Sequence, residues 1–276
     1  KFGNTNMGLR RNFRNFVAQK QILGWPKSSR NDLIDVISQF QPVDTGHDLI
    51  RIGGSGDGGY LVPNDLEGIR HCFSPGVSLI ADFEAELAEK YGIQSYMADA
   101  SVEAPPSDNE HFHFEKKFLG AADGGEFITL QTWMNSQPQT HNDNDLLLQM
   151  DIEGAEYDVF ITTPMDTLKR FRIIVVELHG VERIFDRNFL PLFRPLMQKL
   201  TREFAVAHIH PNNAAPLSKM GGVHVPPLLE VTFLRKDRLI GDGAPIRTLP
   251  HPLDEKNVAH YKDVAIPRDW WSSQLR

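Results

Sequence analysis

The stretch Leu146-Leu-Leu-Gln-Met-Asp-Ile-Glu-Gly-Ala-Glu156 joins a short apolar run to three acids. Residues 146–150 are predicted to form a buried parallel strand, because such strands are near-continuous apolar runs. Open α/β sheets bind ligands beyond the carboxyl ends of their strands, which places Asp151 at a site and a helix over residues 155–160 behind it. Acids can also simply cap a helix N-terminus. Because three acids follow one buried strand, we favour a ligand-binding site over a simple helix cap.

A second apolar run, residues 173–178, ends in Glu177-Leu178-His179. If the two strands are neighbours, Asp151, Glu177 and His179 converge at one edge of the sheet. Asp151 or His179 could then act as a general base, or the three could bind a divalent metal, with manganese, iron, zinc or magnesium as candidates. The plain alternative is a strand end whose polar side chains are satisfied by backbone donors.

Residues 70–99 carry the pattern of a nucleotide-binding half-sheet. A strand over 70–73 ends in Ser74-Pro-Gly-Val-Ser78, a helix is predicted over 82–91, and a strand over 93–97 ends at Asp99. Gly76 would let the backbone approach a ligand, and an acid roughly 20 residues later can accept hydrogen bonds from ribose hydroxyls. A single glycine argues against a dinucleotide fingerprint, and ordinary strands can also end in aspartate.

Two further segments carry candidate substrate contacts. Five glycines occupy residues 53–59, which predicts a glycine-rich hairpin between strands at 49–52 and 60–62 and puts Asp57 and Tyr60 at a ligand. Residues 204–210 alternate as a strand, so His208 and His210 share a face. With Asn212 and Asn213 they are predicted to form a wall of the substrate pocket.

Length and composition indicate how the chain is divided into domains. A chain of 276 residues with 41% hydrophobic content can form one large α/β domain, predicted at 49–240, with an N-terminal helical extension over 1–48 and a C-terminal wrapping tail over 241–276. The extension, with apolar residues at helical spacing over 9–17, is interpreted as a lid or a homo-oligomer contact. Residues 183–200 are predicted helical, bent or divided by Pro191 and Pro195.

Charge and cysteine content narrow the partners further. The formal net charge of −7 argues against a nucleic-acid binder that relies on broad phosphate neutralisation. A single cysteine, Cys72, leaves no internal disulfide or cysteine-rich zinc site, fits a reducing compartment and makes the cytoplasm the expected location. No stretch approaches the roughly 20 apolar residues of a membrane span. The chain starts at Lys1, so a missing upstream signal or anchor stays open.

Four motifs together resemble the FkbM-type S-adenosylmethionine-dependent methyltransferases, in the branch with a Gly-Asp-Gly-Gly-Tyr loop. They are Gly56-Asp-Gly-Gly-Tyr60, Met150-Asp-Ile-Glu-Gly-Ala-Glu156, Val176-Glu-Leu-His-Gly180 and His208-Ile-His-Pro-Asn-Asn213. The likeness runs from about residue 51 to 235. It implies a Rossmann-like class I methyltransferase fold, with a seven-stranded, mostly parallel sheet flanked by helices and an antiparallel last strand. It also implies methylation of oxygen, often on sugars or natural products.

The resemblance assigns roles to individual residues. Ser74, Gly76, Val77, Ser78, Asp99, Asp151 and Glu153 would contact S-adenosyl-L-methionine, and Glu156 would join the substrate contacts. The stretch Phe73-Ser-Pro-Gly-Val-Ser78 departs from the usual Asp-x-Gly-x-Asn-x-Gly first motif and lacks its acid.

The prediction is an S-adenosylmethionine-dependent O-methyltransferase acting on a sugar, glycan or related small molecule, with or without Mn, Mg or Zn. A nucleotide-dependent oxidoreductase and a non-catalytic nucleotide- or glycan-binding module are the alternatives.

Overall fold

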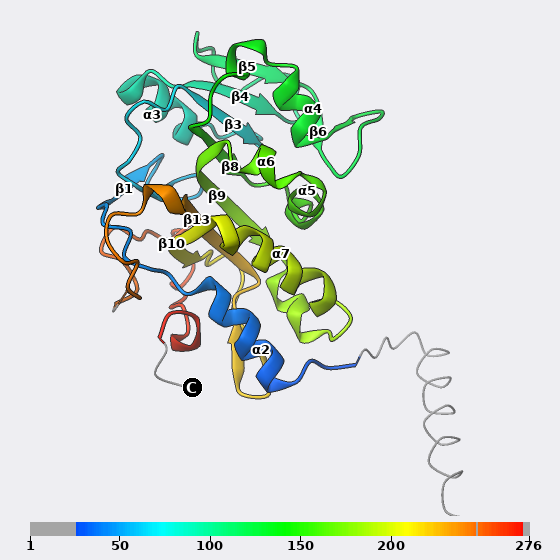
Figure 1. Ribbon diagram of the computed structural model, residues 1–276, viewed down its shortest axis with the longest axis vertical. Helices are drawn as coiled ribbons and strands as arrows, with labels where there is room; N and C mark the ends of the chain where they lie inside the picture. The colour runs from blue at the N-terminus through cyan, green and yellow to red at the C-terminus, as the bar shows by residue number, and fades with distance from the viewer. Residues whose placement is uncertain (1–25, 247, 273–276) are drawn as a thin grey trace, which may run out of the picture.

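The computed structural model describes residues 26–246 and 248–272. Its centre is a seven-stranded sheet with the order β10-β13-β9-β8-β3-β4-β5, which crosses the molecule from β5 to β10 in Figure 1. The bounds are β3 (His71–Pro75), β4 (Gln94–Ala98), β5 (Phe112–Glu115), β8 (Leu146–Met150), β9 (Phe171–His179), β10 (Phe204–Pro211) and β13 (Leu228–Arg235).

The last strand gives the sheet its one change of direction. β13 is antiparallel to both of its neighbours, β9 and β10, whereas β5, β4, β3, β8 and β9 pair in parallel. The expectation of a seven-stranded, mostly parallel sheet with an antiparallel last strand is therefore confirmed.

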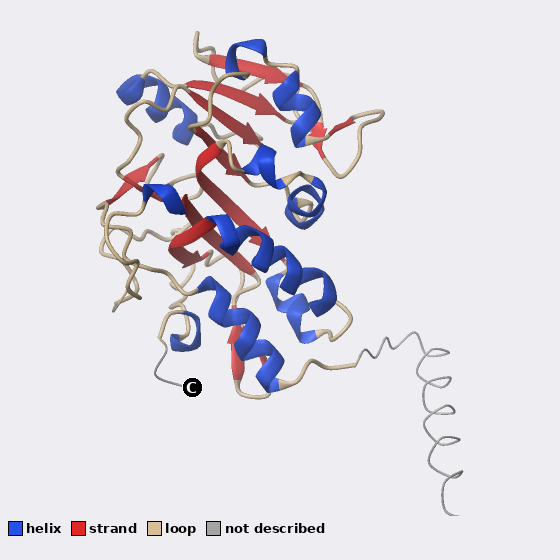
Figure 2. Ribbon diagram, viewed as in Figure 1, coloured by secondary structure: helices blue, strands red, loops and turns tan. Residues whose placement is uncertain are grey.

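Helices cover both faces of the sheet (Figure 2). Side chains alternate along β8, so Leu146 and Leu148 join the larger apolar cluster while Leu147 joins a smaller cluster on the other face. The larger cluster is closed by α2 (Arg30–Ile37), α4 (Leu130–Asn135), α5 (Glu156–Thr162), α6 (Met165–Leu168) and α7 (Leu190–Glu203). The smaller one is closed by α3 (Asp82–Tyr91) and by the hairpin of β1 (Leu49–Ile52) and β2 (Tyr60–Pro63).

The remaining elements are short. They are the strands β6 (Phe118–Leu119), β7 (Phe127–Ile128), β11 (Ser218–Met220) and β12 (Val223–Val225), and the 3-10 turns η1 (Ser38–Phe40), η2 (Pro138–Thr140), η3 (Val181–Phe185), η4 (Lys236–Arg238) and η5 (Arg268–Trp270).

The predicted glycine-rich hairpin is present. β1 and β2 pair antiparallel, with Ile52 opposite Tyr60, and the loop between them needs glycine because a Cβ on Gly59 would lie 2.1 Å from the carbonyl oxygen of Gly54. Thr232 of β13 donates a 2.7 Å hydrogen bond to the carbonyl of Leu61. The hairpin is thereby held against the sheet, with its loop at the carboxyl ends of the strands.

The prediction for residues 183–200 is only partly right. These residues form the 3-10 turn η3 and then α7, which begins at Leu190. Pro191 therefore falls in the first turn of α7, where its missing N–H costs no hydrogen bond, and it starts the helix instead of breaking it. Pro195 lies inside α7.

Both flanks of the predicted central domain pack on the same core. The ring of Phe40 in η1 lies 5.8 Å from that of Phe193 in α7 and 5.3 Å from that of Trp270 in η5. The indole of Trp270 donates to the carbonyl of His224, which fixes the tail. The predicted helix before residue 26 lies outside the described residues, and the divisions at 48/49 and 240/241 stay predictions. Among the residues described, no helix has the length and apolar character needed to cross a membrane.

Candidate active site

A cavity of about 700 Å³ opens at the carboxyl ends of β3, β4 and β8. Eight of the sixteen predicted site residues line it. The loop after β3 contributes Gly76 to Ile80, β4 leads into Asp99, and β8 leads into Asp151 and Glu153. The hairpin contributes Asp57 and Tyr60, and α3 contributes Glu84, which the sequence analysis did not single out.

Gly76 lets the loop after β3 pass close to the end of β8. Its φ is +89°, and a Cβ there would lie 1.5 Å from the carbonyl oxygen of Asp151. The N–H of Asp151 donates back to the carbonyl of Pro75 at 3.3 Å. The close approach predicted for Gly76 is thus an approach to the backbone of Asp151, and it sets the position of Asp151 relative to the cavity wall.

Asp99 is buried at the end of β4 and shapes the loop opposite. Its Oδ2 accepts the N–H of Ser78 at 2.9 Å, and its Oδ1 accepts both the N–H (2.7 Å) and the hydroxyl (2.6 Å) of Ser101. The bond to Ser78 holds that residue at a φ of +47°, in the left-handed region that few non-glycine residues occupy. Each carboxylate oxygen has two lone pairs, so Oδ2 keeps one for a ligand.

Glu156 folds the acidic turn after β8. The turn passes through two left-handed residues, Glu153 (φ +56°) and Gly154 (φ +105°), before α5 begins. Glu156 is fully buried, and its Oε1 accepts the backbone N–H groups of Ile152 (3.2 Å) and Gly154 (3.0 Å). It is therefore an internal anchor of the turn, and a direct contact with substrate, as the resemblance implied, stays a prediction.

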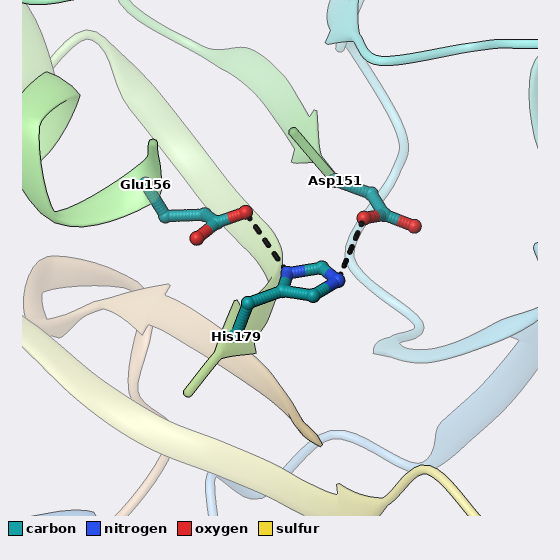
Figure 3. Close-up of side chains that lie close together, drawn as sticks. All are labelled: Asp151, Glu156 and His179. Atoms are coloured by element: carbon teal, nitrogen blue, oxygen red, sulfur yellow. Dashed lines mark hydrogen bonds and ion pairs between the residues drawn. The ribbon is translucent and has the colours of Figure 1, made fainter. Parts of the chain in front are cut away.

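The same oxygen of Glu156 orients His179 at the end of β9. His179 Nδ1 lies 3.1 Å from Glu156 Oε1, and Nε2 lies 3.8 Å from Asp151 Oδ1 (Figure 3). Nε2 also lies 3.4 Å from Glu153 Oε2. Because Oε1 already accepts two N–H groups, it acts as an acceptor, and Nδ1 must carry the hydrogen of the neutral ring. The lone pair of the neutral imidazole is then on Nε2, on the side of Asp151.

Asp151 and His179 influence the charge of each other. Burial acts to lower the pKa of His179, but the hydrogen bond to Glu156 and the neighbouring carboxylates outweigh it and raise that pKa. Burial raises the pKa of Asp151 to about 7, although His179 acts to lower it. Asp151 Oδ1 is buried and makes no hydrogen bond within the described part of the chain.

Glu177 lies apart from this cluster. The described residues hold one group of acids and histidine whose ligand atoms all lie within 4.8 Å of one another, and it contains Asp151, Glu156 and His179. The predicted metal set had Glu177 in the place of Glu156. Glu177 is buried and accepts a 3.0 Å hydrogen bond from the amide of Asn212.

Glu177 belongs instead to a polar row that crosses the neighbouring strands. It pairs with Glu230 of β13, which pairs in turn with His210 of β10, so the three side chains lie on one face of the sheet. Burial and the charges of Asp151 and Glu230 raise the pKa of Glu177 well above its usual range, and burial also raises the pKa of Glu230, against His210.

The polar row continues into the hairpin loop through the tail. Asn257 donates to Glu230 Oε1 at 2.6 Å and to Asp57 Oδ1 at 3.4 Å. Neither Glu230 nor Asn257 was predicted from the sequence as a site residue. An acid inside the apolar run 228–234 was the available signal for Glu230, whereas nothing in the local sequence indicates the reach of Asn257.

The remaining predicted wall residues contact the tail. His208 Nε2 lies 2.8 Å from Asp254 Oδ1, and His210 Nδ1 lies 3.7 Å from the same atom. Burial acts to raise the pKa of Asp254, but the two histidines outweigh it and lower that pKa. The side chain of Asn213 donates to the carbonyl of Val258 at 3.0 Å. Their predicted contact with an acceptor stays a prediction.

Comparison with known families agrees with this geometry. Residues 104–205 match the family model described as the methyltransferase FkbM domain. The matched segment contains β8, the acidic turn and all of β9. No curated protein matches the chain.

The α/β fold and this match together support a methyltransferase domain. Residues 104–205 match the FkbM methyltransferase domain, and the predicted resemblance is confirmed there.

Proposed function

We propose that this protein is a class I, S-adenosylmethionine-dependent methyltransferase that transfers a methyl group to a hydroxyl oxygen. The observation that carries the proposal is the placement of His179 Nε2 beside Asp151, which lines the cavity at the end of β8. The strand order, with an antiparallel last strand inserted between β9 and β10, supports the class I assignment.

The cavity suits an elongated ligand with a nucleoside end. Its volume of about 700 Å³ lies in the range of ordinary cofactor sites, about 300–1,000 Å³. Asp99 offers a free lone pair at the β4 side, where ribose hydroxyls could donate to it. Apolar side chains that are unusually exposed, Leu79 (76%) and Phe127 (50%), line the same cavity and could cover a flat base. When bound, S-adenosylmethionine supplies a methyl group on a positively charged sulfur.

His179 is the proposed general base. Its Nε2 takes the proton of the acceptor hydroxyl while the hydroxyl oxygen forms its bond to the methyl carbon and the carbon–sulfur bond breaks. Glu156 holds the ring through Nδ1, so Nε2 stays directed at the reacting side. When Asp151 is ionised, its carboxylate stabilises the imidazolium that forms.

A divalent metal is the second candidate for activating the hydroxyl. Asp151 Oδ1, which has no hydrogen-bond partner in the described chain, and His179 Nε2 would hold it, and the exposed Glu153 carboxylate could join them. The ion would stabilise the deprotonated hydroxyl. Glu156 Oε1 is committed to two backbone N–H groups and Nδ1, so it would orient His179 in either mechanism.

A hydroxyl-rich acceptor, such as a sugar or glycan, suits the polar row beside Asp151. Glu177, Glu230 and Asn257 present carboxyl and amide groups, which hydrogen-bond to hydroxyls as either donors or acceptors. The row would lie on the acceptor side of the cavity, and the Asp99 end would take the nucleoside.

Calorimetric titration with S-adenosylhomocysteine tests the cofactor assignment. We expect binding by the wild-type protein and, in Asp99→Asn, an affinity lower by about 10-fold or more, because one charge-assisted hydrogen bond is worth about 1.5–3 kcal/mol. Asp108→Asn, at an exposed loop position, is the matched control and should bind as the wild type does.

The same experiment separates the alternatives. Absence of binding to the wild-type protein at millimolar ligand would contradict the cofactor assignment, and binding of a nicotinamide dinucleotide would favour an oxidoreductase. Repeating the titration with EDTA and then with added manganese or magnesium shows whether a metal contributes.

A further inference from the structure

Glu84 is a buried acid in the wall of the cavity. It lies in the first turn of α3, its side chain is only 2% exposed, and yet it lines the cavity. Its neighbours in the helix, Phe83 and Leu87, belong to the smaller apolar cluster. A carboxyl group in such surroundings is costly to keep charged unless a partner compensates it.

The hydrogen bonds around Ser74 indicate the proton state of Glu84. The Ser74 hydroxyl contacts a carboxyl oxygen of Glu84 and also Gln149 Oε1, the latter at 2.7 Å. One hydroxyl has one hydrogen, so it cannot donate to both oxygens. The amide of Gln149 is oriented with its nitrogen toward Tyr60 OH, at 3.4 Å. Ser74 then donates to Gln149, and Glu84 carries the proton that it donates to Ser74.

The electrostatic surroundings agree with a neutral Glu84. Burial raises its pKa to about 7 and Asp82 in the same helix adds to the rise, whereas a hydrogen bond donated by Ser74 to the ionised form acts to lower it. Cys72 faces it from β3, Tyr60 closes the hydrogen-bond chain from β2, and Asp151 of the β8 end lines the same cavity. None of these groups is a cation, so these neighbours give Glu84 no compensating charge.

We propose that Glu84 binds the α-ammonium group of the methionine part of S-adenosylmethionine, and that it releases its proton when it does so. This inference rests on the proposed function. The carboxylic acid O–H bond breaks, the proton passes to solvent, and the carboxylate pairs with the ammonium, which keeps its own protons.

The position of Glu84 relative to Asp99 supports the assignment. Asp99 lies at the β4 side of the cavity, whereas Glu84 contacts Ser74 of β3 and lies next to Gln149 of β8. If Asp99 takes the ribose, the amino-acid end of the ligand lies toward Glu84. The stretch Ser74-Pro-Gly-Val-Ser78 contains no acid, so the carboxylate for the ammonium would come from the helix that follows.

Proton release can be measured on the wild-type protein. S-adenosylhomocysteine carries the same ammonium group, and its titration in buffers of different ionisation enthalpy gives the number of protons released. With a pKa of about 7 for free Glu84, we expect release of about 0.9 proton at pH 6 and about 0.1 at pH 8. The affinity should rise roughly 10-fold between these pH values, because only the ionised form binds the ammonium.

The variant Glu84→Gln isolates the carboxylate. Gln resembles the neutral acid in shape, so its melting temperature should stay near that of the wild type. At pH 8 we expect it to bind S-adenosylhomocysteine about 10- to 100-fold more weakly and without proton release. It should bind 5′-methylthioadenosine, which lacks the amino acid, as the wild type does. Glu89→Gln, exposed on the same helix, is the matched control.

Each outcome decides the proposal. Loss of affinity for S-adenosylhomocysteine alone, together with proton release in the wild type, supports it. Equal affinity of Glu84→Gln and wild type, or no proton release by the wild type, overturns it and leaves the proposed function standing. If the wild type binds neither nucleoside, the proposed function fails and this inference fails with it.

Discussion

At the scale of single residues, the candidate active site depends on how two carboxylates divide their tasks around one imidazole. Glu156 is fully buried and accepts from His179 Nδ1 and from two backbone N–H groups. Asp151 faces Nε2 from the other side, at a distance too long for a hydrogen bond but close enough for its charge to matter. Glu156 thus positions His179, and Asp151 is the acid on the side of Nε2 that we propose faces the reacting atoms.

Replacing Glu156 should change the titration of His179. The hydrogen bond and charge of Glu156 are the leading influences that raise the His179 pKa against burial, so Glu156→Gln should lower that pKa. NMR titration of the imidazole Cε1–H, with EDTA present, measures it. Because the pKa of His179 is raised in the folded state, its protonation stabilises the protein at pH values below the unfolded pKa. This stabilisation is lost as the pH rises through the folded pKa.

Glu153→Gln is the control for that experiment. The Glu153 side chain is 89% exposed, and its charge is the weakest of the three that act on His179, so the pKa should fall less. A larger fall in Glu153→Gln than in Glu156→Gln would contradict the role given to Glu156.

At the scale of elements, the site depends on how closely the loop after β3 passes the end of β8. Gly76 is the residue that allows this contact, since the carbonyl oxygen of Asp151 fills the place of a Cβ. The turn after β8 likewise needs left-handed backbone at Glu153 and Gly154 before α5 can begin. Both features position Asp151.

Gly76→Ala should therefore be far more damaging than an ordinary substitution of a left-handed glycine. Its Cβ would lie 1.5 Å from backbone, so we expect a loss of more than about 3 kcal/mol in the free energy of unfolding, measured in urea. Gly92→Ala is the control: its φ is +65° and no atom lies within 4 Å of the added Cβ, so only the strain of about 1–2 kcal/mol applies. Equal losses in the two variants would refute the contact.

Many of the secondary-structure elements around the site could be predicted from the sequence. The apolar runs of β8 and β9, the helix α3 and the glycine-rich hairpin all follow from local pattern, and so does the convergence of Asp151 and His179. The sequence could not predict that Glu156, and not Glu177, lies beside Asp151 and His179. This arrangement depends on the turn through Glu153 and Gly154, which brings Glu156 back toward His179, and local propensity does not specify that path.

Glu84 was missed for a different physical reason. Its place in a helical pattern makes it indistinguishable from a solvent-facing acid in the sequence. Only the packing of α3 against the sheet, where Glu84 contacts Ser74 of β3, turns it toward the cavity. The polar row was missed in part because Glu230 and Asn257 come from segments far apart in the sequence.

At the scale of the whole molecule, three segments around the sheet contribute to one cavity and its polar border. The hairpin brings Asp57 and Tyr60 over the strand ends, and the tail brings Asn257 to Asp57 and Glu230. Acids from β4 and β8 and from the helix α3 line the cavity between them. The acceptor would meet the polar row at one end, and the nucleoside would lie at the Asp99 end.

The most direct test of this account is a crystal structure of the protein with S-adenosylhomocysteine. We expect the ribose hydroxyls at Asp99, the base beside Phe127, the ammonium at Glu84 and the sulfur on the side of Asp151 that faces His179. Electron density for the ligand elsewhere, or none in this cavity at saturating concentration, would contradict the proposal that this cavity binds the methyl donor.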